Sequence, residues 1–327
     1  MPQGYPCMRH AVDNPPGHGF LTSEVMAFAR GGRIIPSIMT HAAAATVTTL
    51  PSQPTPPQPT PLGLLLREWR AARRMSQMDL ALEAGVSTRH LSCVETGKAQ
   101  PSRELLARLA DTLDMPLRER NALLVAAGYA PRYGEATLAT PAMAPVRQAI
   151  DFIIGQQEPY PAVVMNRRWD VLRTNRATSR IVGLARGGMP RHNNVLRQIF
   201  DPDDMRPVMG NWESLAGDLI CHLHNELAAT PLDQGLRTLL DDVLAYPGVP
   251  ARWRSRDPDA YPLPLCTTVF AGGALDAEGH PLRFFSTITT FGSARDVTVE
   301  ELRIECMFPA DERTAERCKA LAAGSSV

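Results

Sequence analysis

The feature that most constrains this chain is a succession of short helical patterns between residues 62 and 128. Apolar residues such as Leu62, Leu66 and Trp69 recur three and four positions apart, and arginines fill the positions between them. That spacing is typical of amphipathic helices. Further apolar stripes follow as far as Gly128, so the segment predicts a compact domain of five short helices.

A tight turn separates the second and third of these helices. Ser76 stands three residues before Asp79, a spacing typical of the capping box at a helix N-terminus. We expect the second helix to end at Gly85, because glycine adopts the left-handed conformation that terminates helices. Ser87 is a good N-cap for the third helix, and the small Ala81 allows the two helices to cross closely.

The run from residue 76 to residue 98 resembles the helix-turn-helix family of phage Cro and CI repressors and their bacterial relatives. The resemblance rests on Gln77, the small residue at 81, the glycine turn, the apolar residues 86, 91 and 94, and the Glu-Thr-Gly-Lys exit. It implies a DNA-binding domain over residues 62–130, with a double-stranded DNA operator as partner. We expect a homodimer whose third helices enter major grooves about 10 base pairs apart.

The same resemblance implies a role for each exposed residue of the third helix. Arg89 is the main candidate for sequence recognition, because arginine can contact guanine through two hydrogen bonds, worth about 1–3 kcal/mol of discrimination. Cys93 departs from the family pattern, and partial burial of its thiol is an equally good interpretation. The predicted base-contacting residues are Ser87, Thr88, Arg89, His90 and Cys93.

Four other residues of the domain are expected to act without reading bases. Gln77 and Lys98 are placed to contact phosphates, which fixes the register of the protein on DNA. In the family, the residues that correspond to Arg70 and Glu95 form a semi-buried ion pair, so we expect a structural role for both. Residues 62–128 contain ten basic and eight acidic residues, which predicts modest affinity for nonspecific DNA.

Beyond a linker at residues 131–144, residues 145–320 predict a second domain in which helices accompany a small antiparallel sheet. Short strands are expected at 162–165 and 169–173, and a helix near Asn175. Two amphipathic helices are expected around residues 212–223 and 236–243, followed by a hairpin of segments 266–275 and 282–291. A third strand at 303–308 and a helical tail from Asp311 complete an α+β, predominantly α chain, with residues 321–327 disordered.

Across both domains, the chain resembles more narrowly the MmyB-like branch of the same regulators. The resemblance rests on Val86–Ser92, residues 101–104, 117–121 and 126–131 in the first domain, and on residues 166–170, 175, 289–292, 296–298 and 301–304 in the second. It implies a PAS-like sensor domain that binds an apolar small molecule such as a fatty acid. The candidate pocket residues are Trp169, Phe200, Trp212, His222, Arg283 and Phe285, with Arg283 or His222 to neutralise a carboxylate; ordinary core or surface positions are an alternative for each.

Catalytic and metal sites are not expected, and neither is a cofactor. His222 and His224 are two residues apart on a predicted helix, about 200° around its axis, so they cannot share a metal ion. The acidic residues Asp201, Asp203 and Asp204 have no evident acid–base partner. Alternatives to ligand control are a C-terminal domain that only mediates dimerisation or protein interaction, and an antitoxin-like repressor.

Composition sets the remaining limits. The 34 basic and 34 acidic residues cancel, so DNA binding must depend on a local surface. Six scattered cysteines without a CxxC pair argue against a zinc ribbon or a disulfide framework. Residues 1–61, with six prolines between Pro51 and Pro61, are expected to be a disordered tail or the product of an upstream start codon. Without a membrane-spanning stretch, we expect a cytoplasmic protein.

Overall fold

The computed structural model describes residues 60–254, 267–272, 275 and 278–324. Of the tail predicted for residues 1–61, only the last two positions are described, and both belong to the first helix. Thr60 is its N-cap, with a side-chain oxygen that accepts a hydrogen bond from the Gly63 amide, and Pro61 is its first residue. The N-terminal domain therefore begins slightly earlier than the sequence pattern indicated.

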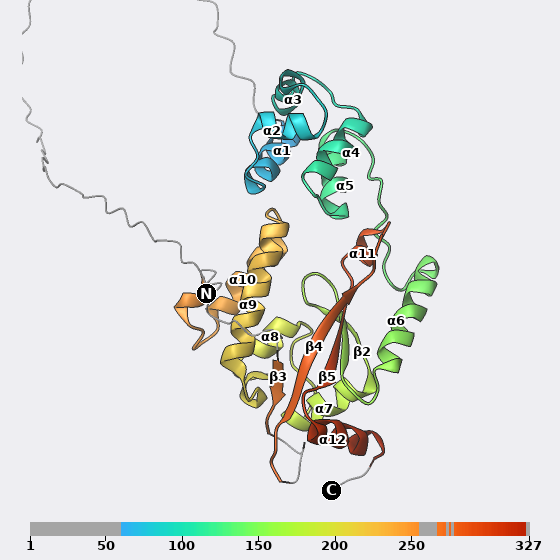
Figure 1. Ribbon diagram of the computed structural model, residues 1–327, viewed down its shortest axis with the longest axis vertical. Helices are drawn as coiled ribbons and strands as arrows, with labels where there is room; N and C mark the ends of the chain where they lie inside the picture. The colour runs from blue at the N-terminus through green and yellow to red at the C-terminus, as the bar shows by residue number, and fades with distance from the viewer. Residues whose placement is uncertain (1–59, 255–266, 273–274, 276–277, 325–327) are drawn as a thin grey trace, which may run out of the picture. The chain divides into compact units, whose positions relative to one another are not determined.

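Five helices form the N-terminal domain, as the apolar spacing predicted (Figure 1). They are α1 (Pro61–Ala72), α2 (Gln77–Glu83), α3 (Thr88–Glu95), α4 (Arg103–Thr112) and α5 (Leu117–Ala126). Their apolar faces meet in one core that includes Leu66, Trp69, Leu91, Val94 and Leu109, each almost completely buried. Burial of this surface, worth about 25 cal/mol per Å², holds together helices that are too short to be stable alone.

Local hydrogen bonds, predicted from the sequence, set the ends of α2 and the start of α3. Ser76 and Asp79 form a complete capping box at the start of α2. Gly85 follows with φ of 66°, a left-handed conformation that is cheap only for glycine, and the Val86 amide donates to the Ala81 carbonyl at 2.9 Å. The Ser87 hydroxyl then caps α3. These caps fix where α3 begins and hence which of its side chains are exposed.

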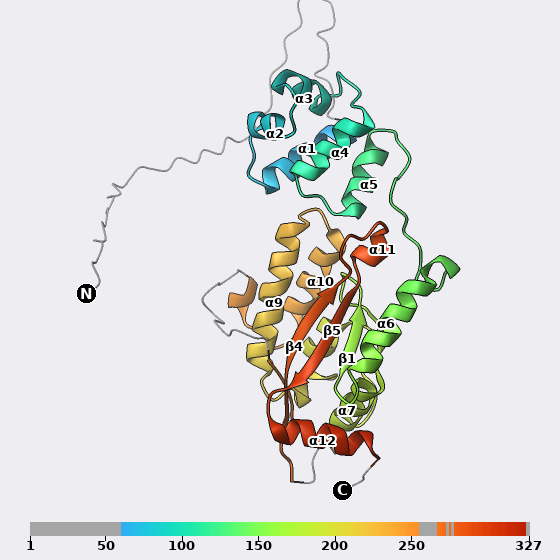
Figure 2. The same ribbon diagram turned by 45° about the vertical axis from the view of Figure 1, so that its right-hand side comes forward.

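The C-terminal domain is built on a five-stranded antiparallel sheet with the strand order β2-β1-β5-β4-β3. Figure 2 shows β5 between β4 and β1. The strands are β1 (Ala162–Met165), β2 (Val171–Thr174), β3 (Thr267–Phe270), β4 (Leu282–Thr290) and β5 (Arg303–Pro309). The predicted hairpin corresponds to β3 and β4, and the predicted third strand is β5, which lies at the centre of the sheet. The α+β architecture with a small antiparallel sheet, expected from the sequence, is confirmed.

Helices cover the two faces of this sheet differently. α6 (Ala144–Gln156) packs on one face, where Ile150 and Ile154 meet Val164, Ile304 and Cys306. The opposite face carries the larger core, to which most of the other helices contribute. Those helices are α7 (Arg176–Arg186), α8 (Val195–Phe200), α9 (Trp212–Ala229), α10 (Gln234–Ala245) and α12 (Glu312–Ala322).

Several elements of the chain are only one helical turn long. One-turn helices are η1 (Pro141–Met143), η2 (Arg206–Val208), η3 (Ala251–Arg254) and α11 (Val297–Glu300). The segment expected to be a linker, residues 131–144, is ordered by contacts with the C-terminal domain: Gly134 forms a bridge with Asp296, and the Ala136 amide donates to the Asp296 carboxylate at 3.2 Å. The two domains are therefore joined by a segment that is itself docked.

Gly63 provides a test of the packing between α1 and α3. A Cβ atom at this position would lie 2.0 Å from the Glu95 carbonyl oxygen, which is backbone and cannot move aside without displacing α3. We expect Gly63→Ala to lower the free energy of unfolding by about 1–3 kcal/mol, the usual cost of overpacking. Urea denaturation of the full chain would measure it.

Gly155→Ala is the matched control, because Gly155 is an exposed residue of α6 and a Cβ there meets nothing within 4 Å. This substitution should stabilise the protein by about 0.5–1 kcal/mol through the higher helix propensity of alanine. Equal effects of the two substitutions would contradict the close approach of α1 and α3.

Candidate DNA-binding surface and ligand cavity

α3 presents one polar face to solvent. Ser87, Thr88, Arg89 and His90 are all exposed, and Cys93 is half-buried. On the opposite side of the same helix, Leu91 and Val94 are buried in the domain core. This arrangement agrees with the sequence-based expectation that the leading residues of α3 are accessible, and it leaves them free to contact base edges.

A buried carboxylate at the end of α3 ties three helices together. Glu95 is 1% exposed, and Arg70 of α1 donates to both of its oxygens, at 3.1 and 3.3 Å. Arg67 lies 3.4 Å from the same carboxylate, and the Gln77 side-chain amide of α2 donates to it at 3.0 Å. Hydrogen bonds and opposite charges thus compensate a negative charge that would be costly to bury alone.

Gln77 and Lys98, the predicted phosphate contacts, have different surroundings. Lys98 is exposed just after α3, where its ammonium group is accessible. Gln77 is half-buried, and its amide is already engaged with Glu95. In the absence of DNA, therefore, the Gln77 side chain has a structural role that the sequence pattern did not indicate.

The C-terminal domain contains a cavity of about 390 Å³ between the sheet and the helices α7, α8 and α9. Its volume lies in the range of small-molecule sites, which is about 300–1,000 Å³. Most of its walls are apolar, and they come from β1, β2, β3, β5, the three helices and the loop before α8. The apolar lining includes Val163, Trp169, Val182, Val195, Ile199, Met205, Met209, Leu215, Leu219, Phe270 and Met307.

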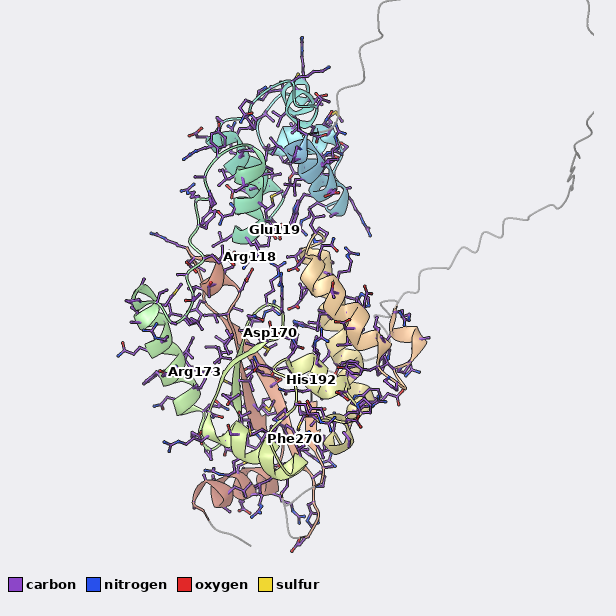
Figure 3. All side chains as sticks on the ribbon, turned by 180° about the vertical axis from the view of Figure 1, so that it is seen from behind. Arg118, Glu119, Asp170, Arg173, His192 and Phe270 are labelled. Carbon is purple, nitrogen blue, oxygen red and sulfur yellow. The ribbon has the colours of Figure 1, made fainter. Side chains whose placement is uncertain are left out.

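Two basic residues at the cavity walls already have acidic partners. Arg173 of β2 pairs with Asp151 of α6, and the His192 Nε2 atom lies 2.7 Å from an Asp201 carboxylate oxygen. Figure 3 shows Arg173 near α6, and His192 and Phe270 farther from that helix. Because both basic groups are paired, neither is a ready partner for the charge of an acidic ligand.

Trp169 is the one predicted pocket residue that lines the cavity. It sits at the end of a turn in which the Asn166 side chain accepts hydrogen bonds from the Arg168 and Asp170 amides. Its φ is 66°, an uncommon conformation for a residue other than glycine. The indole NH donates to Glu226 of α9 at 3.1 Å, which links the cavity wall to that helix.

The other five predicted pocket residues lie elsewhere. Phe200 and Trp212 belong to an aromatic cluster with Trp253 in the core. Strand alternation directs Phe285 to the face of the sheet where it stacks on Phe308.

Arg283 and His222 were expected to neutralise a carboxylate. Arg283 is exposed on β4, and its amide donates to Thr314. His222 packs against the edge of Trp169 with 5.5 Å between ring centroids, and burial together with nearby Arg303 lowers its pKa. Neither residue lines the cavity, and His222 is neutral near pH 7.

Glu305 is a lining residue that sequence reasoning missed. It stands in β5 between the buried residues Ile304 and Cys306, on the other side of the strand. The sequence signal that could have identified Glu305 is a single carboxyl group within residues 303–308, a run that otherwise favours a β-strand. The face it occupies is decided by pairing with Val163 of β1 and Ile288 of β4, which the sequence does not show.

A second hollow, of about 520 Å³, lies beside α4 and α5 in the N-terminal domain. Its walls include Arg103, Glu104, Arg120 and Arg132, charged residues that suit a solvated surface better than an apolar ligand. Among the described residues no group of three or more His, Cys, Asp or Glu side chains could hold a metal ion. No helix in the described part of the chain is long and apolar enough to cross a membrane.

An exposed third helix in a helix-turn-helix arrangement in one domain and an apolar cavity in the other fit a DNA-binding transcription regulator with a ligand-binding domain. Residues 61–123 match a helix-turn-helix domain, and residues 146–321 match the MmyB-like transcription regulator ligand binding domain. Because the second match covers more than half of the chain, the protein belongs to the MmyB-like transcription regulators. Both are families of transcription regulators rather than enzymes.

Solved structures and curated proteins add little to this assignment. The chain is 34% identical to the restriction-modification controller protein C.AhdI from Aeromonas hydrophila over 19% of its own length and 92% of that chain, with a TM-score of 0.18. An RNA-binding light-oxygen-voltage receptor is 12% identical, with 82% of this chain and 64% of the receptor covered and a TM-score of 0.21. No curated protein matches the sequence.

The Glu95 cluster predicts a large and specific loss of stability. Glu95→Ala would leave the partly buried Arg70 guanidinium without its partner, and we expect the free energy of unfolding to fall by about 3–5 kcal/mol. Chemical denaturation followed by circular dichroism would measure it. Glu68→Ala, at an exposed position of α1, should change stability by less than about 0.5 kcal/mol. A Glu95→Ala protein as stable as that control would show that the cluster contributes no net stability.

Proposed function

We propose that this protein is a sequence-specific, homodimeric transcription regulator of the cytoplasm whose affinity for its operator is controlled by an apolar, fatty-acid-like molecule in the cavity of the C-terminal domain. The observation that carries the proposal is the combination of an exposed α3 with a largely apolar cavity in a single chain. Each of these two features fits one half of the proposed activity.

The exposed face of α3 supports base recognition. Arg89 and Thr88 lie in the first turn of the helix, the part that reaches base edges when a recognition helix enters the major groove. The Lys98 ammonium group would bind a phosphate of the DNA backbone. Two such domains would engage the half-sites of a palindromic operator, which compensates for the small positive charge of each.

The cavity supports binding of an apolar molecule. Its walls combine aromatic, aliphatic and methionine side chains from the sheet and three helices, and methionine adapts readily to ligands of varied shape. A ligand changes DNA binding only if it binds two conformations of the protein with different affinity. The cavity must therefore be connected with residues that contact the N-terminal domain.

β5 provides such a connection. Glu305 of this strand lies at the cavity, and Arg303, two residues earlier, pairs with Glu226, which accepts the Trp169 indole NH. Immediately before the strand, Glu301 accepts a hydrogen bond at 2.7 Å from Arg118 of α5, labelled in Figure 3. A shift of β5 on ligand binding would thus act directly on a helix of the DNA-binding domain.

A second candidate function, in which the C-terminal domain only mediates dimerisation or protein interaction, is favoured by one observation. Phe152 of α6 is 69% exposed, and a large apolar side chain at a helix surface suits a protein contact. The two candidate functions differ in the role of the cavity, because the dimerisation or interaction function assigns it none. The antitoxin-like alternative has no comparable structural support.

The recognition assignment predicts a change of sequence preference in Arg89→Ala. We expect the variant to lose about 1–3 kcal/mol on the preferred operator and to relax specificity at the base it contacts. Selection of binding sites from a random DNA pool, followed by affinity measurements, would show this. Lys98→Ala is the matched control, because it should weaken all sites alike and reduce the salt dependence. Unchanged base preferences in Arg89→Ala would refute the assignment.

The cavity assignment predicts that apolar molecules copurify with the protein. We expect organic extracts of the purified chain to contain lipid-like species by mass spectrometry, and added long-chain compounds to raise the melting temperature through preferential binding to the folded state. Val182→Trp would fill the cavity from α7 and abolish both effects, whereas Val125→Trp, at an exposed position of α5, would not. No bound species and no thermal shift would favour the dimerisation module instead.

A further inference from the structure

The cavity has one acidic group directed into it, on the central strand of the sheet. Residues 303, 305 and 307 of β5 alternate with Ile304 and Cys306, which pack toward α6. The Glu305 side chain therefore extends from the opposite face, together with Met307, and both line the cavity. The Glu305 side chain is half-buried, because protein surrounds it on most sides and the cavity lies on the remaining side.

The surroundings of Glu305 offer little compensation for a negative charge. Its neighbours across the sheet are Val163 and Ile288, both aliphatic. Within the described residues, Glu305 has no arginine, lysine or histidine within ion-pair distance. Burial raises the pKa of Glu305, while a hydrogen bond from Ser286 and the vicinity of His222 act in the opposite direction. The carboxyl group is thus biased toward its neutral form, in which one oxygen carries a proton and can donate it in a hydrogen bond.

The other charged groups near Glu305 are already engaged. On the same strand, Arg303 pairs with Glu226 of α9, and the same Glu226 carboxylate is 3.1 Å from the His222 Nε2 atom. At the cavity walls, Arg173 and His192 pair with acidic residues. An ionised ligand group would therefore enter an apolar space without a partner of opposite charge, which is unfavourable.

We propose that the Glu305 carboxyl group donates a hydrogen bond to the polar end of the ligand, and that the ligand is an uncharged, mostly apolar molecule with an oxygen acceptor, such as a long-chain alcohol or ketone. This inference rests on the proposed ligand-binding function of the cavity. It narrows that function, because a fatty-acid anion would place a second acidic group beside Glu305, and two adjacent carboxyl groups cannot both ionise without repulsion.

Three probes that differ only in the polar end would test the proposal on the full-length chain. 1-Decanol, decanoate and decylamine share an alkyl chain, and isothermal titration calorimetry at several pH values, below and above the raised pKa of Glu305, would give their affinities. We expect decanol to bind about tenfold or more tightly than either charged probe, which corresponds to one favourable hydrogen bond or one unpaired charge. Tightest binding of decanoate, or of decylamine, would overturn the proposal.

Two variants separate the hydrogen bond from the shape of the cavity. Glu305→Gln keeps the volume and a neutral donor, so decanol affinity should stay within about threefold of wild type, whereas Glu305→Met removes the donor and should weaken decanol by about tenfold. Melting temperatures would verify that both variants fold, and the comparison of probes on the wild-type chain does not depend on them. Equal affinity of decanol for both variants would contradict the proposed hydrogen bond.

The pH dependence provides an independent measurement. The folded protein can donate from Glu305 only below the raised pKa of this group, so decanol affinity should fall as the pH increases through that pKa. The Glu305→Gln variant should lack this fall, although His222, His192 and Arg303 remain. An identical pH profile in both proteins would contradict the proposal. Failure of all three probes to bind, with no copurified apolar species, would instead refute the ligand-binding function itself.

Discussion

The buried carboxylate of Glu95 is the interaction on which the DNA-binding domain depends. It lies at the last residue of α3 and receives hydrogen bonds from Arg70 of α1 and Gln77 of α2. A charge buried to this extent is tolerated only when its partners are held in place. The positions of three helices are thereby fixed relative to each other, and with them the residues at the other end of α3 that face solvent.

In the C-terminal domain the comparable element is β5, the central strand of the sheet. One face of this strand supports the core under α6, and the other carries Glu305 and Met307 to the cavity. Glu301, two residues before the first residue of β5, pairs with Arg118 of α5. β5 is paired on both sides, with β1 and β4, and we propose that a displacement at the cavity reaches α5 along this strand.

Much of the N-terminal domain could be predicted because its signals are local. Ser76, Asp79, Gly85 and Ser87 each act within one helical turn, and the structure has the caps and the left-handed turn that they indicated. The Arg70–Glu95 contact, over a separation of 25 residues, was anticipated only through resemblance to a family. The engagement of Gln77 with the same carboxylate was not anticipated, since nothing in the spacing distinguishes it from a phosphate contact.

For the cavity, the sequence by itself determined that aromatic and aliphatic side chains would cover a small sheet, and it located the strands to within a few residues. Only the tertiary structure decided which of these side chains surround open space. Phe200 and Trp212 fill the core, Phe285 faces the other side of the sheet, and Glu305 faces the cavity. The physical reason is that a shift of one residue in strand register exchanges the two faces of a strand, and that register is set by pairing between segments more than a hundred residues apart.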